Sequence, residues 1–143
     1  MNSSILSAME HRIAQEHWIE YKVFFRFAEE HELPNSPGEP KLFFTMATQD
    51  HLPCMNYDIF YSVERSGNTI AVRALDIGIP GSICLTAFGP ATARFELPLD
   101  QGSYTLVLLN GSLQDIYRLT VSDQAVKVEA VDARWSEPAP SPQ

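Results

Sequence analysis

The stretch that decides the fold is residues 102–121, GSYTLVLLNGSLQDIYRLTV. Apolar side chains recur at every second position on both sides of Asn110 and Gly111, and this period of two is typical of half-buried strands. The Asn-Gly dipeptide tolerates the positive φ angles of a type I′ turn. We therefore expect two antiparallel strands joined by a tight turn at Asn110 and Gly111.

The same period of two recurs in both directions from this stretch. It is found at 18–27, 55–63, 69–74, 92–97 and 126–128, with Gly-, Pro-, Asn- or Ser-rich turns between most of these segments. Such a series predicts an all-β chain of about seven to eight short strands, arranged as an antiparallel β-sandwich. Alternation in nearly every strand indicates that one face of each sheet is buried and the other is in water.

Residues 100–106, DQGSYTL, resemble the segment that opens strand F of the immunoglobulin-like sandwich. The resemblance implies that the Tyr104 hydroxyl bonds back to the main chain and that Leu106 stands where the family has its second cysteine. Residues 102–121 also resemble the C-terminal hairpin of immunoglobulin-like domains in bacterial cell-envelope proteins. The resemblance gives structural roles to Asp100, Gly102, Tyr104, Asn110 and Gly111.

The chain reads as a single domain with two flanking segments. Residues 1–17 are expected to form an N-terminal extension, and apolar residues at helical spacing after Ser4 favour a short helix there. The sandwich domain is expected to span 18–132. Residues 133–143 are expected to be a disordered tail, because three prolines fall within EPAPSPQ.

Charge narrows the classes of partner. Ten Lys and Arg against eighteen Asp and Glu give a net charge of −8, whereas nucleic acid and anionic membranes attract basic surfaces. No apolar run is long enough to span a bilayer, so no membrane insertion is expected. A protein partner or self-association is expected instead. Asp100, Asp115 and Asp123 are expected at turns, with their carboxylates in water.

Cys54 and Cys84 leave three alternatives open. A disulfide between them would stabilise the chain by roughly 3–4 kcal/mol on the chain-entropy model and imply an oxidising compartment. Two unpaired thiols would behave as small apolar residues. A metal or catalytic site would use His51 together with both cysteines, since zinc accepts these ligands. No second ligand motif accompanies them, so we expect no metal and no cofactor.

Several aromatic side chains fall on the faces assigned to water. Three explanations stand side by side: the face assignment is wrong in some strands, the N-terminal helix covers the face, or the side chains form a partner surface. The residues concerned are Trp18, Phe24, Phe43, Phe60 and Phe88.

No nucleophile-elbow, P-loop, dinucleotide-binding or metalloprotease motif is present. We therefore expect a non-enzymatic binding or assembly module that presents an apolar surface or an open strand edge to a protein partner. One alternative is a small metal- or thiol-dependent enzyme or redox protein that uses His51, Cys54 and Cys84. A carbohydrate-binding sandwich is a further alternative.

The cellular compartment is left open by the sequence. The first seventeen residues lack a basic segment followed by an unbroken apolar one, and a start of this kind favours the cytoplasm. The disulfide alternative and the envelope-like hairpin favour a bacterial domain exported to the periplasm or cell envelope, with its signal absent from this chain. We slightly prefer the exported interpretation.

Overall fold

The computed structural model describes residues 18–31, 33, 38–79, 81, 83–123 and 125–140. All regular structure in this part of the chain is β, as the alternating pattern predicts. The helix expected within residues 1–17 lies outside the described residues.

Eleven strands are present in the described part of the chain. They are β1 (Val23–Glu30), β2 (Lys41–Thr48), β3 (Leu52–Cys54), β4 (Asp58–Ser66), β5 (Thr69–Gly78), β6 (Thr86–Gly89), β7 (Thr92–Glu96), β8 (Gly102–Asn110), β9 (Leu113–Val121), β10 (Val126–Asp132) and β11 (Ser136–Pro138).

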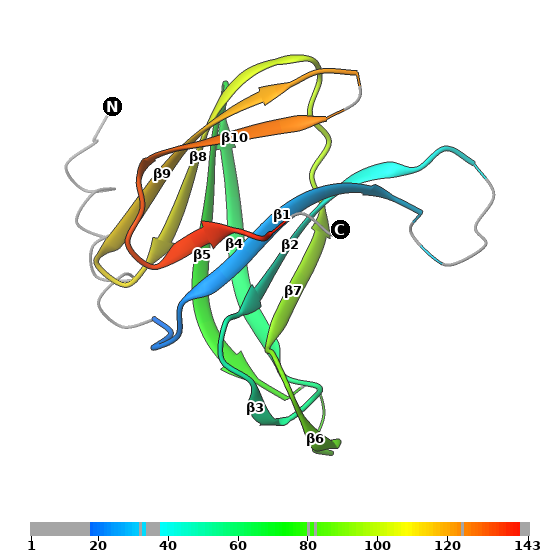
Figure 1. Ribbon diagram of the computed structural model, residues 1–143, viewed down its shortest axis with the longest axis vertical. Helices are drawn as coiled ribbons and strands as arrows, with labels where there is room; N and C mark the ends of the chain where they lie inside the picture. The colour runs from blue at the N-terminus through cyan, green and yellow to red at the C-terminus, as the bar shows by residue number, and fades with distance from the viewer. Residues whose placement is uncertain are drawn as a thin grey trace.

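Nine of these strands form one sheet in the order β10-β9-β8-β5-β4-β7-β2-β1-β11, and β3 pairs with β6 in a separate ribbon. Figure 1 shows that the large sheet curls round until β10 and β1 face each other. Three of its pairings are parallel: β4 with β7, β5 with β8, and β1 with β11. The expected antiparallel sandwich is therefore corrected to a mixed, nearly closed, barrel-like sheet.

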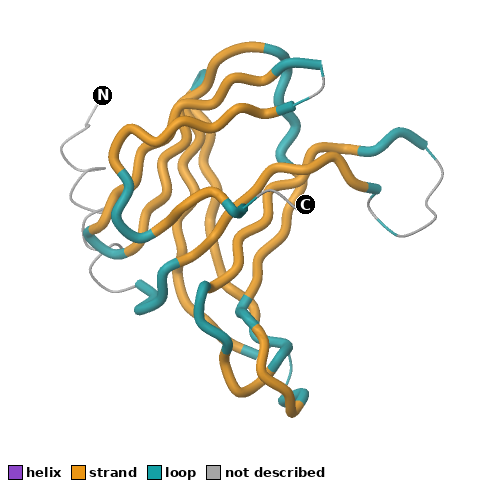
Figure 2. Tube along the Cα trace, viewed as in Figure 1, coloured by secondary structure: helices purple, strands orange, loops and turns teal. Residues whose placement is uncertain are grey.

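The tube in Figure 2 lets the reader follow this curl, and buried apolar side chains from its strands form one core cluster. Val23 and Phe25 of β1 are buried, as their alternation predicts. The Phe25 ring meets Tyr117 of β9 edge-to-face at 4.8 Å between centroids and stacks on Phe44 of β2 at 5.8 Å. The Phe25–Tyr117 contact joins strands from opposite sides of the curled sheet, whereas Phe25 and Phe44 lie on neighbouring strands.

The turn between β8 and β9 differs by one position from the prediction. Asn110 pairs with Leu113, so the two turn residues are Gly111 and Ser112. Gly111 has φ +60, a left-handed conformation that glycine adopts at little cost. The shift makes Asn110 the last residue of β8 and leaves its side chain buried rather than in the turn.

The tyrosine-corner prediction is confirmed in its geometry. The Tyr104 hydroxyl donates to the Asp100 carbonyl oxygen at 2.8 Å, and the Tyr104 ring is buried. This bond fixes the main chain just before β8.

The chain after residue 132 is not the disordered tail that its composition predicts. Trp135 and Ser136 are buried, and β11 pairs in parallel with the start of β1. Pro138 is tolerated because β11 is an edge strand, where a missing N–H leaves no ladder bond broken. Residues 141–143 lie outside the described part of the chain.

Candidate functional site

The seam between β10 and β1, where the sheet nearly closes on itself, is closed at one end by a buried carboxylate. Asp115 of β9 is fully buried rather than in water as expected. Its oxygens accept hydrogen bonds from the main-chain N–H groups of Arg134, Trp135 and Ser136 at 2.9–3.0 Å. The Ser136 hydroxyl adds a fourth bond at 2.6 Å. One side chain of β9 therefore holds the segment that leads into β11.

Tyr117 reinforces the same end of the seam. Its hydroxyl donates to the Ser136 carbonyl oxygen at 2.9 Å and lies 2.9 Å from the Ser136 hydroxyl. Burial raises the pKa of the Tyr117 phenol above its usual 10.0; the Ser136 side-chain bond opposes this shift, and the nearby Asp115 and Glu137 charges add to it. The phenol is thus held in its neutral, donating form.

Asn110 anchors the segment that precedes β1. Its side-chain amide accepts from the Ile19 N–H at 2.7 Å and donates to the Ile19 carbonyl at 2.8 Å. The Trp135 indole N–H donates to the Leu108 carbonyl at 3.1 Å. Each bond joins residues distant in sequence and satisfies a buried polar group. Side chains therefore fix this end of the seam together with the short β1–β11 ladder.

The other end of the seam has no such closure among the described residues. β11 pairs only with Val23, Phe24 and Phe25, and the Ala139 N–H donates to the Phe25 carbonyl at 2.7 Å. Beyond Phe25, the only described strand that pairs with β1 is β2. Main-chain groups alternate in direction along a strand. The N–H and C=O groups of Phe27 and Glu29 therefore face the seam, as those of Phe25 do.

β10 presents a second edge that is unpaired among the described residues. There it pairs with β9 alone, and the Ser122 N–H donates to the Ala125 carbonyl at the turn between these strands. Alternation from that bonded pair places Lys127 and Glu129 in the ladder with β9. The main-chain groups of Val126 and Val128 then point away from β9, toward the seam.

A cleft of about 540 Å³ lies at this open end. Phe27 and Leu42 line it from β1 and β2, while Val121 and Val126 line it from β9 and β10. Phe27 and Val126 are partly buried and pack against the core. Its size is within the range of ligand-binding pockets.

Carboxylates rim this cleft, and no Lys or Arg is among its described lining residues. Glu29, Asp100 and Asp123 supply the charges. The Gln101 side-chain amide donates to the Asp123 carboxylate, which braces the segment before β8 against the β9–β10 turn. The tyrosine corner fixes Asp100 in the same rim.

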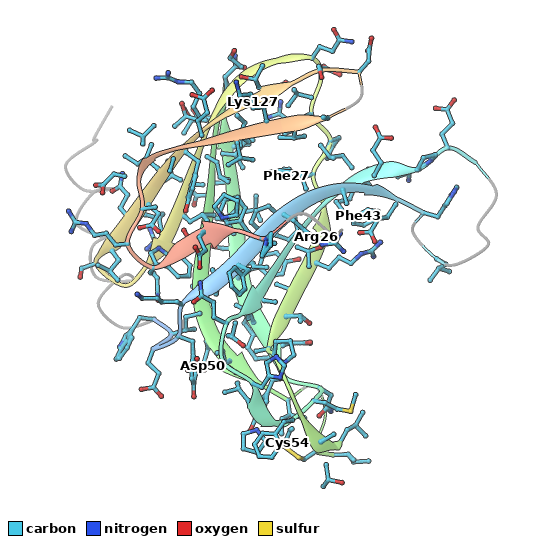
Figure 3. All side chains as sticks on the ribbon, in the orientation of Figure 1. Arg26, Phe27, Phe43, Asp50, Cys54 and Lys127 are labelled. Carbon is cyan, nitrogen blue, oxygen red and sulfur yellow. A yellow bond between two sulfur atoms is a disulfide. The ribbon has the colours of Figure 1, made fainter. Side chains whose placement is uncertain are left out.

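The ribbon of β3 and β6 forms a second surface, at the far end of the molecule in Figure 1. Cys54 and Cys84 are paired as a disulfide, with their Cα atoms 5.3 Å apart; Figure 3 labels Cys54 at this tip. The Asn56 side chain donates to the Ile83 carbonyl at 2.8 Å and accepts from the Leu85 N–H at 3.0 Å. Of the three alternatives for the cysteines, the geometry favours the bridge.

Large apolar side chains are exposed at this disulfide-linked tip. No Asp, Glu, Lys or Arg falls in residues 52–57 or 83–91. The exposed members are Met55, Ile83, Leu85 and Phe88.

Of the five aromatic residues expected on outward faces, three are exposed, one is partly buried and one is buried. Trp18, Phe60 and Phe88 are exposed, by 57%, 46% and 74%, and Phe24 is partly buried. The expectation is wrong for Phe43, which is buried outside the main core under the Arg94 guanidinium, 3.8 Å from the ring centroid. A cation can cover an aromatic face in this way.

The metal- or thiol-dependent alternative loses its ligands in this arrangement. Both cysteines are committed to each other, and His51 is exposed. Among the described residues, no three His, Cys, Asp or Glu side chains gather closely enough to hold a metal ion. Nor does any helix in that part of the chain have the length and apolar character needed to cross a membrane.

Two further clefts, of about 530 and 510 Å³, flank residues 19–21. Trp18 and Tyr21 line both of them. Because both clefts border the first described residue, they carry no separate site here.

The open seam was not identified from the sequence. Phe27 and Val126 lie in segments where the sequence shows only a period of two, and no local pattern states which strand edge lacks a neighbour. No protein-family model, curated protein or solved structure matches this chain, so any conclusion about its function rests on the arrangement of its own residues.

Proposed function

We propose that this chain is a non-enzymatic binding module that accepts an extended segment of a partner protein at the open end of the seam. The observation that carries the proposal is a pair of strand edges, β1 beyond Phe25 and β10, that face one cleft and have no strand neighbour in the part of the chain that the structure describes. Main-chain bonds to such edges supply affinity in strand addition, and pockets for alternate side chains supply specificity.

The direction of the two edges limits how a segment can bind. Followed through the pairings of the sheet, β10 runs opposite to β1, as Figure 1 also shows. A segment bound to both edges is therefore parallel to one and antiparallel to the other. Phe27 and Val126 offer apolar contacts to its inward-facing side chains.

The test uses random linear peptides selected by display against the folded chain. Selected peptides are synthesised, and their affinity is measured by fluorescence anisotropy for the wild type, Val128→Pro and Val128→Ala. Both variants shorten or replace the side chain, but only proline removes the N–H that points into the seam. We expect Val128→Pro to weaken binding about tenfold, the equivalent of one main-chain hydrogen bond, and Val128→Ala to change it much less.

Failure to select any peptide would overturn the proposal, as would equal affinities for the two variants. If Val128→Pro does not fold, amide exchange of the wild type provides the readout. Bound peptide is then expected to slow exchange at Phe27, Glu29 and Val128, and unchanged exchange there contradicts strand addition.

The disulfide-linked tip is the second candidate contact surface, and its exposed Phe88 favours it. An uncharged, apolar projection suits a protein groove. Light scattering and hydrophobic-dye binding of the Phe88→Ser variant test this surface. The Trp18→Ser and Phe60→Ser variants are measured in parallel, because these two aromatic side chains are also exposed. A wild type that is strictly monomeric and binds no dye contradicts it.

The immunoglobulin-like identity is part of the proposal as well. The Tyr104 bond to Asp100 supports it, whereas the parallel β5–β8 pairing departs from the antiparallel sandwich.

A further inference from the structure

We infer that the segment accepted at the open seam is basic, with Lys or Arg beside alternating apolar residues. This inference rests on the proposed function and specifies the chemistry of the partner segment. It is drawn from the charges of the rim and from the direction of the side chains beside the two edges.

Two carboxylates of the rim have no cation in the described part of the chain. Glu29 and Asp100 make no ion pair there, whereas the neighbouring Glu30 pairs with Arg94 at 3.5 Å. Asp123 is already engaged by the Gln101 amide. A cationic side chain is therefore the complement that Glu29 and Asp100 lack.

The geometry places these charges where a bound strand would project side chains. Glu29 and Phe27 are two positions apart on β1, so their side chains share one face of the strand. Asp100 lies across the cleft in a main chain fixed by the Tyr104 hydroxyl. An incoming strand whose apolar residue contacts Phe27 brings a residue two positions along toward Glu29.

The main-chain edges do not select charge, so the rim sets the specificity. Complementary charge across an interface contributes specificity and association rate, and its effect falls as salt rises. The net charge of the chain, −8, is negative like the rim of the cleft, so it also attracts a basic segment at longer range. A second copy of this acidic chain is accordingly a poor occupant of the cleft.

The probes are two synthetic peptides, KTVTKTV and ETVTETV, capped at both ends and identical apart from the replacement of both Lys by Glu; in each, the charged residues lie two positions from a Val and so share its face. Binding to the wild type, Glu29→Gln, Asp100→Asn and the control Glu64→Gln is measured by anisotropy and by amide chemical shifts. Glu64 lies on β4 with an exposed side chain and outside the cleft. Each measurement is repeated at high salt.

We expect the basic peptide to bind about tenfold more tightly than the acidic one at low salt. Glu29→Gln and Asp100→Asn should each reduce that preference several-fold, and Glu64→Gln should leave it unchanged. Equal binding of both peptides, with shifts at Phe27 and Val128, would overturn the inference and leave strand addition standing. If neither peptide binds and display selects no peptide, both the inference of a basic segment and the proposal of strand addition are overturned.

Discussion

The two ends of one seam differ in how the sheet is completed. At one end, Asp115 and Tyr117 reach across from β9 and hold the segment around Trp135 and Ser136 with buried hydrogen bonds. At the other end, Phe27 of β1 and Val126 of β10 face a cleft with unpaired main-chain groups beside them. The comparison shows that a curled sheet can be completed by side chains and that the edge remains available where they are missing.

The difference has an energetic basis. A buried carboxylate is tolerated only where donors satisfy it, and Asp115 has three main-chain donors and a hydroxyl. The carboxylates at the open end remain on the rim, where water solvates them. The closed end therefore contributes to folding stability, while main-chain groups at the open end have no partner in the described part of the chain.

We expect the greatest loss of folding stability from a substitution at the closed end of the seam. Asp115→Ala leaves three main-chain N–H groups of residues 134–136 without an acceptor, those of Trp135 and Ser136 in buried positions, and we expect it to lower the free energy of unfolding by about 3 kcal/mol or more. Its matched control is Asp123→Ala at the open end, which should change the free energy by about 0.5 kcal/mol or less. Urea denaturation measures both. Equal losses would show that the two ends are not different in kind.

A smaller loss of stability is expected where Asn110 holds the segment before β1. Asn110→Ala removes both bonds to the Ile19 main chain, and we expect a loss of about 2 kcal/mol. Ser112→Ala in the same turn is the control, because Ser112 is exposed and its loss should be close to neutral. A thermal melt of each variant is sufficient. Two equal melting temperatures would mean that the bonds from Asn110 to Ile19 add nothing to stability.

The smallest effect concerns the phenol at the closed end and depends on pH. Tyr117→Phe should cost about 1 kcal/mol at neutral pH, because the Ser136 carbonyl loses its donor. Burial raises the pKa of Tyr117 in the folded protein, so above pH 10 the unfolded chain loses the proton first. The stability that Tyr117 contributes is fully present below pH 10 and is lost as pH rises through its folded pKa.

Urea unfolding of the wild type and Tyr117→Phe on both sides of pH 10 measures this dependence. The wild-type advantage should be constant below pH 10 and shrink above it. An advantage that stays constant into the alkaline range would contradict the buried, neutral phenol.

Local pattern was enough to predict most of the strands and one detail of their connections. The period of two identified β8 and β9, and the resemblance at residues 100–106 implied the Tyr104 hydroxyl bond that the structure confirms. These features depend on residues close together in sequence. The position of the turn was wrong by one because Asn110 bonds to Ile19, and nothing in residues 102–121 reports a partner 91 positions away.

The features that the sequence did not predict depend on contacts between distant segments. The parallel pairings join strands whose own patterns are equally compatible with antiparallel neighbours. The sequence pattern of Asp115 is that of a solvated turn residue, but residues 134–136 pack over it and donate hydrogen bonds to its carboxylate. Pro138 indicated disorder, but an edge strand accommodates proline. The open seam is itself a consequence of strand order, which no single segment encodes.

Amide hydrogen exchange, resolved by residue, tests the contrast between the two ends most directly. We predict slow exchange for the N–H groups of Trp135 and Ser136, which donate hydrogen bonds to the Asp115 carboxylate. The N–H groups of Phe27 and Val128 should exchange about a hundredfold faster or more. Protection of Phe27 and Val128 equal to that of Trp135 would show that the seam is closed along its whole length, and it would contradict the account.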